Sequence, residues 1–163
     1  MVETTGGFTS AGLALEAKTL TLASLTQAQA LEIGGIAQEF GLDRKLPIAI
    51  EVRMKDWIVF HASLPGSSPE NDSWIRRKAN VVNKTGHSTI YEKVLAEEQG
   101  IDWHKSKGVE DELYAIHGGG LALNVVGLGL TGILLISGLT EVEDHLLGIE
   151  ILTEYLARNG EEL

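Results

Sequence analysis

Apolar residues in the first half of the chain repeat with two distinct spacings. After Thr26, whose capping-box partner is Gln29, apolar residues recur at helical spacing up to Gly41. Residues 48–53 alternate between apolar and polar, and a second apolar run covers 57–64. This pattern predicts one helix followed by an antiparallel hairpin of two strands.

Two further helices are expected after a break at the Pro-Gly-Ser-Ser-Pro segment 65–69. The first should begin at Asn71 or Asp72, because both residue types are good helix caps, and should end at Gly86. The second should begin after Ser88 and end at Gly100. Residues 102–112 are mostly charged and are expected to form a surface connection.

Three strands, at 113–116, 121–126 and 130–137, and a last helix after Thr140 complete the pattern. The stretch 121–139 carries no charge and is long enough to cross a membrane, but four glycines interrupt it and acidic residues follow at once. A buried hairpin is therefore the better interpretation.

The expected order of elements is α-β-β-α-α-β-β-β-α, which predicts an α/β (α+β) protein with helices packed on one mostly antiparallel sheet. Residues 1–24 show no clear period and are expected to form a loose N-terminal arm, with a short amphipathic segment near Leu13 to Leu20 as the alternative. Residues 25–160 are expected to form a single domain, which suits a chain of 163 residues.

Composition excludes several classes of function. The chain has no cysteine, so disulfides, cysteine-ligated metal and a thiol nucleophile are excluded. Its 13 basic and 23 acidic side chains give a net charge of −10, which disfavours nucleic acid and anionic membrane as partners. The N-terminus has neither the basic region nor the apolar run of a signal peptide, so a cytoplasmic location is expected.

Cations and a histidine form the first two candidate sites. Arg76 and Arg77 could bind a carboxylate of a ligand, or they could pair with acidic residues on the surface or at a subunit interface. His87, next to Gly86, could ligate haem iron or transfer protons. Alternatively, it could be a capping or core histidine whose hydrogen bonds are made by the backbone.

Two further candidate sites follow in the second half of the chain. The glycines after His117, Gly118 and Gly119, could direct backbone N–H groups at an anion, or could simply form a bend between strands. Asp144 and His145 are adjacent in the last helix and therefore point about 100° apart. They cannot chelate one metal ion by themselves.

Four motifs in this order resemble a small branch of the haem-degrading-domain superfamily. They are N-D-x-W-x-R-R-K, G-H-S, H-G-G and I-S-G-L-x-x-x-E-D-H. The superfamily includes GlcG proteins, haem-binding HbpS proteins and the C-terminal domain of PduO cobalamin enzymes. The matching residues are Asn71, Asp72, Trp74, Arg76, Arg77, Lys78, Gly86, His87, Ser88, His117, Gly118, Gly119, Ile136, Ser137, Gly138, Leu139, Glu143, Asp144 and His145.

The resemblance implies a profilin-like or PAS-like sheet of five antiparallel strands, a homo-oligomeric, dimer-based assembly and a small-molecule ligand. Haem or a related tetrapyrrole is the leading candidate, with His87 as the iron ligand. Residues expected to bind the ligand are Asn71, Trp74, Arg76, Arg77, His87, His117, Gly118, Gly119, Asp144 and His145.

Three functions remain open from the sequence. The first is a small-ligand or haem-binding protein without established catalysis, with its pocket expected where His87, His117 and Arg76 or Arg77 converge. The second is a structural or interaction protein whose motif residues stabilise an oligomer. The third is a hydrolase or oxygenase that uses His87 as a general base beside Gly118 and Gly119.

Overall fold

The computed structural model describes residues 2–160, which fold around one antiparallel sheet. Its strands are β1 (Ala49–Met54), β2 (Trp57–Ser63), β3 (Gly120–Val125) and β4 (Gly129–Ser137), in the spatial order β2-β1-β4-β3. β1 lies in the centre, and its first residue, Ala49, is paired with the last residues of both β2 and β4.

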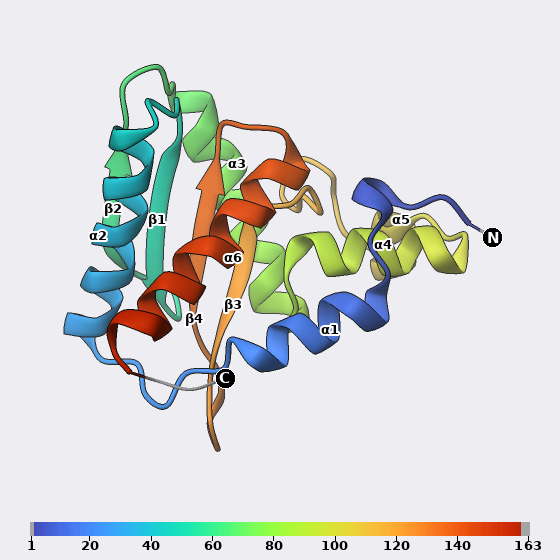
Figure 1. The fold of residues 1–163 in the computed structure, drawn as a ribbon. Helices are drawn as coiled ribbons and strands as arrows, with labels where there is room; N and C mark the ends of the chain where they lie inside the picture. The colour runs from blue at the N-terminus through green and yellow to red at the C-terminus, as the bar shows by residue number, and fades with distance from the viewer. Residues whose placement is uncertain (1, 161–163) are drawn as a thin grey trace.

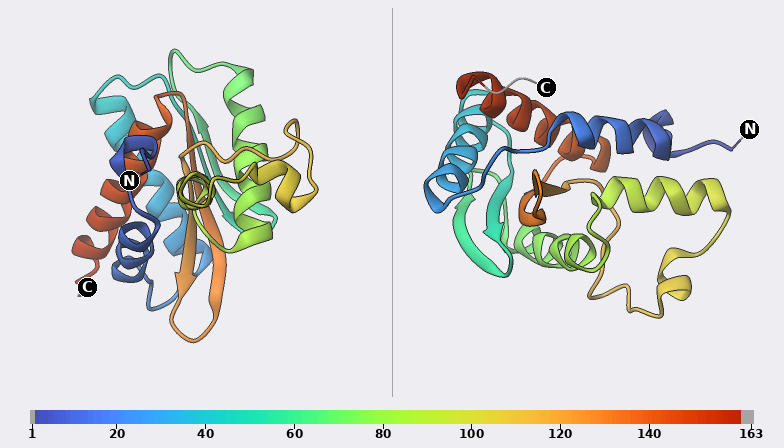
Figure 2. Two further views of the ribbon diagram at one scale, coloured as in Figure 1. Left: turned by 90° about the vertical axis from the view of Figure 1, so that its right-hand side faces the viewer. Right: turned by 90° about the horizontal axis from the view of Figure 1, so that it is seen from below.

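Helices cover both faces of this sheet (Figures 1 and 2). α2 (Gln27–Asp43) and α6 (Glu141–Arg158) lie side by side on one face, and α3 (Pro69–Thr85) lies on the other. α4 (Thr89–Gln99), the short α5 (Trp103–Lys107) and α1 (Ser10–Thr19) extend the molecule beyond the β3 edge. The arrangement is a three-layer α+β domain with a side group of helices.

Because successive side chains of a strand point to opposite faces, the apolar residues of the sheet form two cores, one beneath each layer of helices. Ile50, Val52, Leu134 and Ile136 face α2 and α6 in the larger core. Ala49, Ile133 and Leu135 face α3 in a smaller core. Because β4 is buried on both faces from Ile133 to Ile136, its sequence is continuously apolar there, and this explains the uncharged stretch before α6.

Both predicted hairpins are confirmed: β1–β2 covers the first alternating segment, and β3–β4 covers the uncharged stretch. Within residues 2–160, no helix is both long and apolar enough to cross a membrane. The helix predicted after Thr26 is also confirmed, with both capping-box hydrogen bonds. It continues past Gly41 to Asp43, because Gly41 packs closely under Leu64 inside the helix.

The strand predicted at residues 113–116 does not form, and the prediction of a five-stranded sheet is corrected. Residues 113–116 form a turn and a connecting segment, so the sheet of the described residues has four strands. The backbone N–H of Ala115 donates to the carbonyl of Arg77 on α3, at 3.1 Å. The segment is therefore held against the middle of α3 and pairs with no strand of the described sheet.

Residues 1–24 were expected to form a loose arm, but part of this stretch folds as α1. Thr9 caps the helix, and Leu13 packs against Ile90 and Val94 of α4. The side chains of Glu97 and Glu98 accept hydrogen bonds from Thr5 and Ser10 respectively. These partners lie 92 and 88 residues away in the chain, so no local pattern indicates them.

Two smaller corrections concern the start of α3 and an additional short helix. α3 begins at Pro69 after the cap Ser68, two or three residues earlier than expected, because proline is well suited to the first helical position. A further short helix, α5, lies within the expected surface connection. It forms because Asp102 caps it and Trp103 is buried against Val81 and Ala96.

Two neighbouring glycines of α2 should respond oppositely to alanine. A methyl group at Gly34 would lie 2.3 Å from the ring of Phe60, whereas a methyl group at Gly35 would meet open space. Alanine is favoured over glycine in a helix by about 1 kcal/mol. Overpacking costs about 1–3 kcal/mol.

We therefore expect Gly35→Ala to raise the free energy of unfolding, and Gly34→Ala to be less stable than Gly35→Ala by about 1–3 kcal/mol. Urea unfolding followed by circular dichroism measures both values. Equal stability of the two variants would show that α2 does not pack on β2 as closely as described.

Candidate functional site

Two cavities divide the residues expected at the site. The first measures about 160 Å³ and lies between α1, α4, β3 and α6. The second measures about 340 Å³ and lies between α3, the end of β4 and the start of α6. No residue lines both. His87 and His145 line the first, and Asn71, Trp74, His117 and Asp144 line the second.

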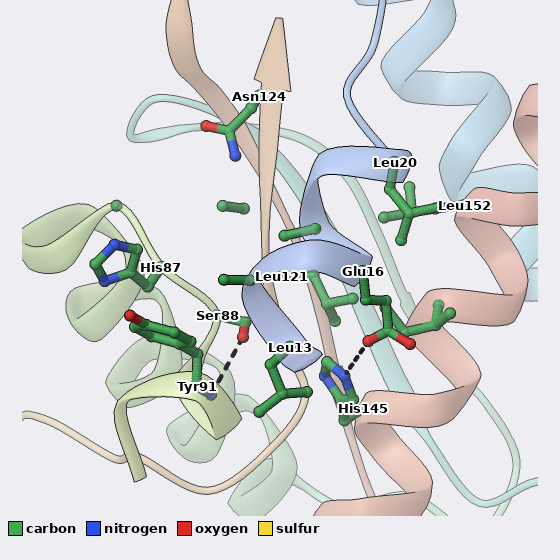
Figure 3. A pocket seen from close by; sticks show the side chains of 15 residues that line it. Leu13, Glu16, Leu20, His87, Ser88, Tyr91, Leu121, Asn124, His145 and Leu152 are labelled. Carbon is green, nitrogen blue, oxygen red and sulfur yellow. Dashed lines mark hydrogen bonds and ion pairs between the residues drawn. The ribbon is translucent and has the colours of Figure 1, made fainter. Parts of the chain in front are cut away.

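The first cavity is mainly apolar, and α1 crosses it (Figure 3). Its apolar lining includes Leu13 of α1, Leu20 directly after that helix, Leu121 of β3 and Leu152 of α6. His87 and Tyr91 lie at one side, and His145 with Glu16 lies at the other. The cavity therefore has a mainly apolar lining, with the exposed His87 on one side and the buried His145 on the other.

His87 stands at the rim of this cavity because two helices meet there. Gly86 caps the C-terminal end of α3 in the left-handed conformation, and Ser88 caps the start of α4. His87 is the one residue between these two caps. The Nδ1 atom of His87 lies 2.7 Å from Oε2 of Glu92, and its ring packs 4.5 Å from that of Tyr91. The Nε2 atom has no hydrogen-bond partner among residues 2–160.

Glu92 is a buried carboxylate, only 4% exposed, that fixes His87 in this position. Its Oε1 atom accepts a hydrogen bond from the indole N–H of Trp103, at 2.9 Å. Its Oε2 atom accepts from Nδ1 of His87, which leaves the lone pair of Nε2 free when the ring is neutral. A carboxylate behind an imidazole is the usual support of a metal-ligating histidine.

His145 is the second histidine of this cavity and is fully buried. Its Nε2 atom lies 3.2 Å from the carboxylate of Glu16 on α1, and the ring of Phe8 packs edge-on against it. Its Nδ1 atom is buried without a hydrogen-bond partner among the residues that the structure describes. Such an atom has capacity for a ligand or a water molecule.

Three buried polar side chains form the floor of the second cavity: Lys78, Ser137 and Asp144. The ammonium group of Lys78 donates to the carbonyl of Ile136 at 2.8 Å and to Asp144 at 3.3 Å. Burial lowers the pKa of Lys78 and raises that of Asp144, while the attraction between the two groups opposes both shifts. Asn71 donates to the hydroxyl of Ser137 at 3.3 Å.

His117 and Glu141 stand at the mouth of the second cavity. Nδ1 of His117 lies 3.5 Å from Glu141, and its ring packs edge-on against Trp74 at 5.0 Å. Lys93 donates to both oxygens of Glu141, at 2.7 and 2.9 Å. Burial by itself raises the pKa of Glu141, but hydrogen bonds from His117 and Lys93 outweigh it and hold this pKa at about 2.

Gly118 and Gly119 allow close packing beneath this cavity. A methyl group at Gly118 would lie 2.1 Å from the carbonyl oxygen of Glu141, and one at Gly119 would lie 2.7 Å from Nζ of Lys78. Gly119 also has a φ of 123°, which side chains rarely adopt. The structure thus gives both glycines a packing role.

Neither arginine lines the two cavities. Arg76 is exposed on α3. Arg77 donates to the carbonyl of Asp111 at 2.6 and 3.1 Å, and its guanidinium lies 4.4 Å over the ring of Trp74. It supports the outer side of Trp74, which itself lines the second cavity.

Sequence reasoning missed the roles of Lys78, Glu92, Glu141 and Ser137. Lys78 and Ser137 belong to the recognised motifs, but their partners lie 66 residues away. Glu92 is four residues after Ser88 and looks like an ordinary first-turn acid. Within residues 2–160, no group of three or more His, Asp or Glu side chains is arranged to hold a metal ion.

The four-stranded antiparallel sheet with helices on both faces defines an α+β protein whose fold matches several solved structures. The chain belongs to the family described as "Haem degrading protein HbpS-like", which matches residues 25–153. The resemblance drawn from the four motifs is confirmed.

Relatives of similar length carry the name UPF0303 protein. One from Streptomyces avermitilis is 36% identical, and the match covers 90% of each chain. One from Rhizobium johnstonii is 34% identical, and the match covers 93% of each chain.

Several solved structures have a fold similar to that of this chain. The Ybr137w protein has a TM-score of 0.83 and 25% identity, with 91% of this chain and 89% of that chain covered. A PduOC:heme complex has a TM-score of 0.68 and 17% identity, covering 80% of this chain and 94% of that chain. HbpS has a TM-score of 0.60 and 16% identity, with 81% of this chain and 89% of that chain covered. The last two show a shared fold.

Glu141 should give the protein a distinct acid sensitivity. Because its pKa is about 2 in the folded state, against an ordinary value of 4.5, it favours the folded state above pH 4.5 and loses this effect as pH falls toward 2. Glu141→Gln should therefore lower stability at neutral pH and flatten the dependence of stability on pH between 4.5 and 2.

Urea unfolding at a series of pH values tests this expectation. Glu112→Gln serves as the control, because Glu112 is an exposed carboxylate outside both cavities. Identical pH profiles for Glu141→Gln and the unaltered chain would rule out the paired carboxylate described for Glu141.

Proposed function

We propose that this chain is a homo-oligomeric small-ligand-binding protein that takes haem or a related tetrapyrrole at the first cavity, with His87 as the iron ligand. The observation that carries the proposal is the pairing of His87 with the buried Glu92 at the rim of an apolar cavity. No catalysis is part of the proposal.

The electrostatics of Glu92 favour a cation at His87. A buried carboxylate is costly unless a positive group faces it. Among the described residues the one basic side chain paired with Glu92 is His87, and the remaining hydrogen bond comes from a neutral indole. A metal ion bound at Nε2 would supply the missing positive charge, and the histidine would stay neutral.

The donor chemistry of the cavity fits haem, whereas its present volume does not enclose a macrocycle. Small-molecule sites usually measure roughly 300–1,000 Å³, and this cavity measures about 160 Å³. His87 is 52% exposed at the side chain, so it can be reached from outside. Since α1 roofs the cavity through few buried residues, a tetrapyrrole would be held here only with α1 displaced.

The comparisons support the same class of ligand. The family is described as haem-degrading, and one protein of the same fold was solved as a heme complex. Four of the other predicted ligand residues line the second cavity and are not needed for this proposal: Asn71, Trp74, His117 and Asp144. The cytoplasmic location stays a prediction.

Haemin titration followed by the Soret band tests the proposal. The unaltered chain should give a saturable, shifted band, and His87→Ala should abolish it. Glu92→Gln should weaken binding by about 10–100-fold, as loss of a carboxylate behind a metal-ligating histidine usually does.

His61→Ala is the matched control, because His61 also pairs with a buried glutamate, Glu51, but its Nε2 atom contacts Ser63 and Asp72. His117→Ala controls for the second cavity. A broad, unsaturable band that is the same in every variant would end the haem proposal for this chain.

The homo-oligomeric part of the proposal rests on the edge strand β2. Within the described residues β2 pairs only with β1, so its other edge carries unpaired backbone groups. Trp57 and Ile58, at the start of this strand, are 58% and 49% exposed. An exposed apolar edge of this kind suits pairing with a second copy of the chain.

Trp57→Arg combined with Ile58→Lys should therefore reduce the mass measured by size-exclusion chromatography with light scattering. Leu31→Lys, an exposed apolar residue of α2 on another face, should leave the mass unchanged. A chain that is monomeric before any substitution would refute the homo-oligomer.

A further inference from the structure

We propose that the second cavity is a separate binding site for a small organic carboxylate, held at its floor by Lys78 and Ser137 and at its wall by Trp74. This cavity shares no lining residue with the first. Its volume of about 340 Å³ lies at the lower end of the roughly 300–1,000 Å³ typical of small-molecule sites.

Unused hydrogen-bond donors define the ligand. An ammonium group has three N–H donors, and Lys78 uses two of them, on Ile136 and Asp144. The hydroxyl of Ser137 accepts from Asn71, and its own proton has no acceptor among the described residues. The indole N–H of Trp74 likewise donates to no group within residues 2–160.

Side chains with unused donors that line one cavity favour an acceptor-rich ligand. A carboxylate offers two oxygens with about four lone-pair sites, whereas an ammonium or an alkyl group has no acceptor for these donors. Hydrogen bonds to a charged acceptor are about twice as strong as those between neutral groups. The floor of this cavity therefore favours a carboxylate over the corresponding amide.

Three acidic side chains line this cavity, and two of them are paired with lysines. The acidic groups of the cavity are already engaged: Asp144 accepts from Lys78 and from the N–H of Leu139, and Glu141 accepts from Lys93. The N-terminal ends of α3 and α6 both lie at this cavity, and helix N-termini carry partial positive charge. Glu70 is exposed at the rim, where solvent screens it.

The walls limit the size of the ligand. Trp74 is held from outside by the guanidinium of Arg77 and from the side by the ring of His117, so its orientation is fixed. Leu139 also lines the cavity. This arrangement leaves space for a short carbon chain beside a carboxylate that reaches Ser137 and Lys78.

Isothermal calorimetry with the full chain tests the proposal, using acetate, pyruvate and succinate as probes. At least one of them should bind saturably, and pyruvamide, the neutral counterpart of pyruvate, should bind about tenfold more weakly or not at all. The same titration in ¹H–¹⁵N NMR should shift the indole signal of Trp74 with the same dissociation constant. Trp57 and Trp103 lie outside the cavity, so their signals should stay in place.

Two variants locate the site. Ser137→Ala should weaken binding of the carboxylate by about tenfold, while Ser63→Ala, at the end of the neighbouring strand β2, should leave it unchanged. Replacing only Lys78 would leave Asp144 buried without its partner, so Lys78→Met is combined with Asp144→Leu. This double variant exchanges a buried ion pair for apolar groups, which proteins often tolerate, and should fold but not bind.

Several outcomes would overturn the proposal: no saturable heat with any of the three acids, equal affinity for pyruvamide, or unchanged affinity in both Ser137→Ala and the folded double variant. The haem proposal is tested independently, because His87→Ala should leave carboxylate binding intact and Ser137→Ala should leave the Soret band intact. Each proposal can therefore fail without the other.

Discussion

The buried ion pair between Lys78 and Asp144 joins the three layers of the molecule. Lys78 belongs to α3 on one face of the sheet, and Asp144 belongs to α6 on the other. The ammonium group also binds the carbonyl of Ile136 in β4, and Asp144 accepts the N–H of Leu139 after that strand. Because removing one partner of a buried pair is strongly destabilising, the register of both helices on the sheet is tied to this contact.

Glycines provide the space that this contact and the helix packing require. Gly119 lets Lys78 reach its partners, and Gly118 lets the chain pass beside the first turn of α6. Further along, Gly148 of α6 lies directly over Leu121, and Gly34 of α2 lies over Phe60. At these positions the missing side chain is what lets a helix approach the sheet so closely.

The two cavities have opposite chemistry because different elements build them. Packing of α1 over β3 and α6 leaves an apolar space whose rim holds a histidine supported by a buried glutamate. The second space opens where the starts of α3 and α6 meet the end of β4, and helix starts concentrate polar caps and free N–H groups. The two proposed ligands, a tetrapyrrole and a small carboxylate, are therefore assigned to different cavities.

The sequence by itself determined the family, the two hairpins and the principal helices, because hydrophobic period, caps and breakers act over a few residues. It also placed the motif residues on the correct elements. Only the tertiary structure decided that residues 113–116 form no strand, that α1 packs on α4, and that His87 and His117 line different cavities. The partners that settle these points, such as Glu97 for Thr5 and Asp144 for Lys78, lie tens of residues away, and no local pattern specifies contacts over such separations.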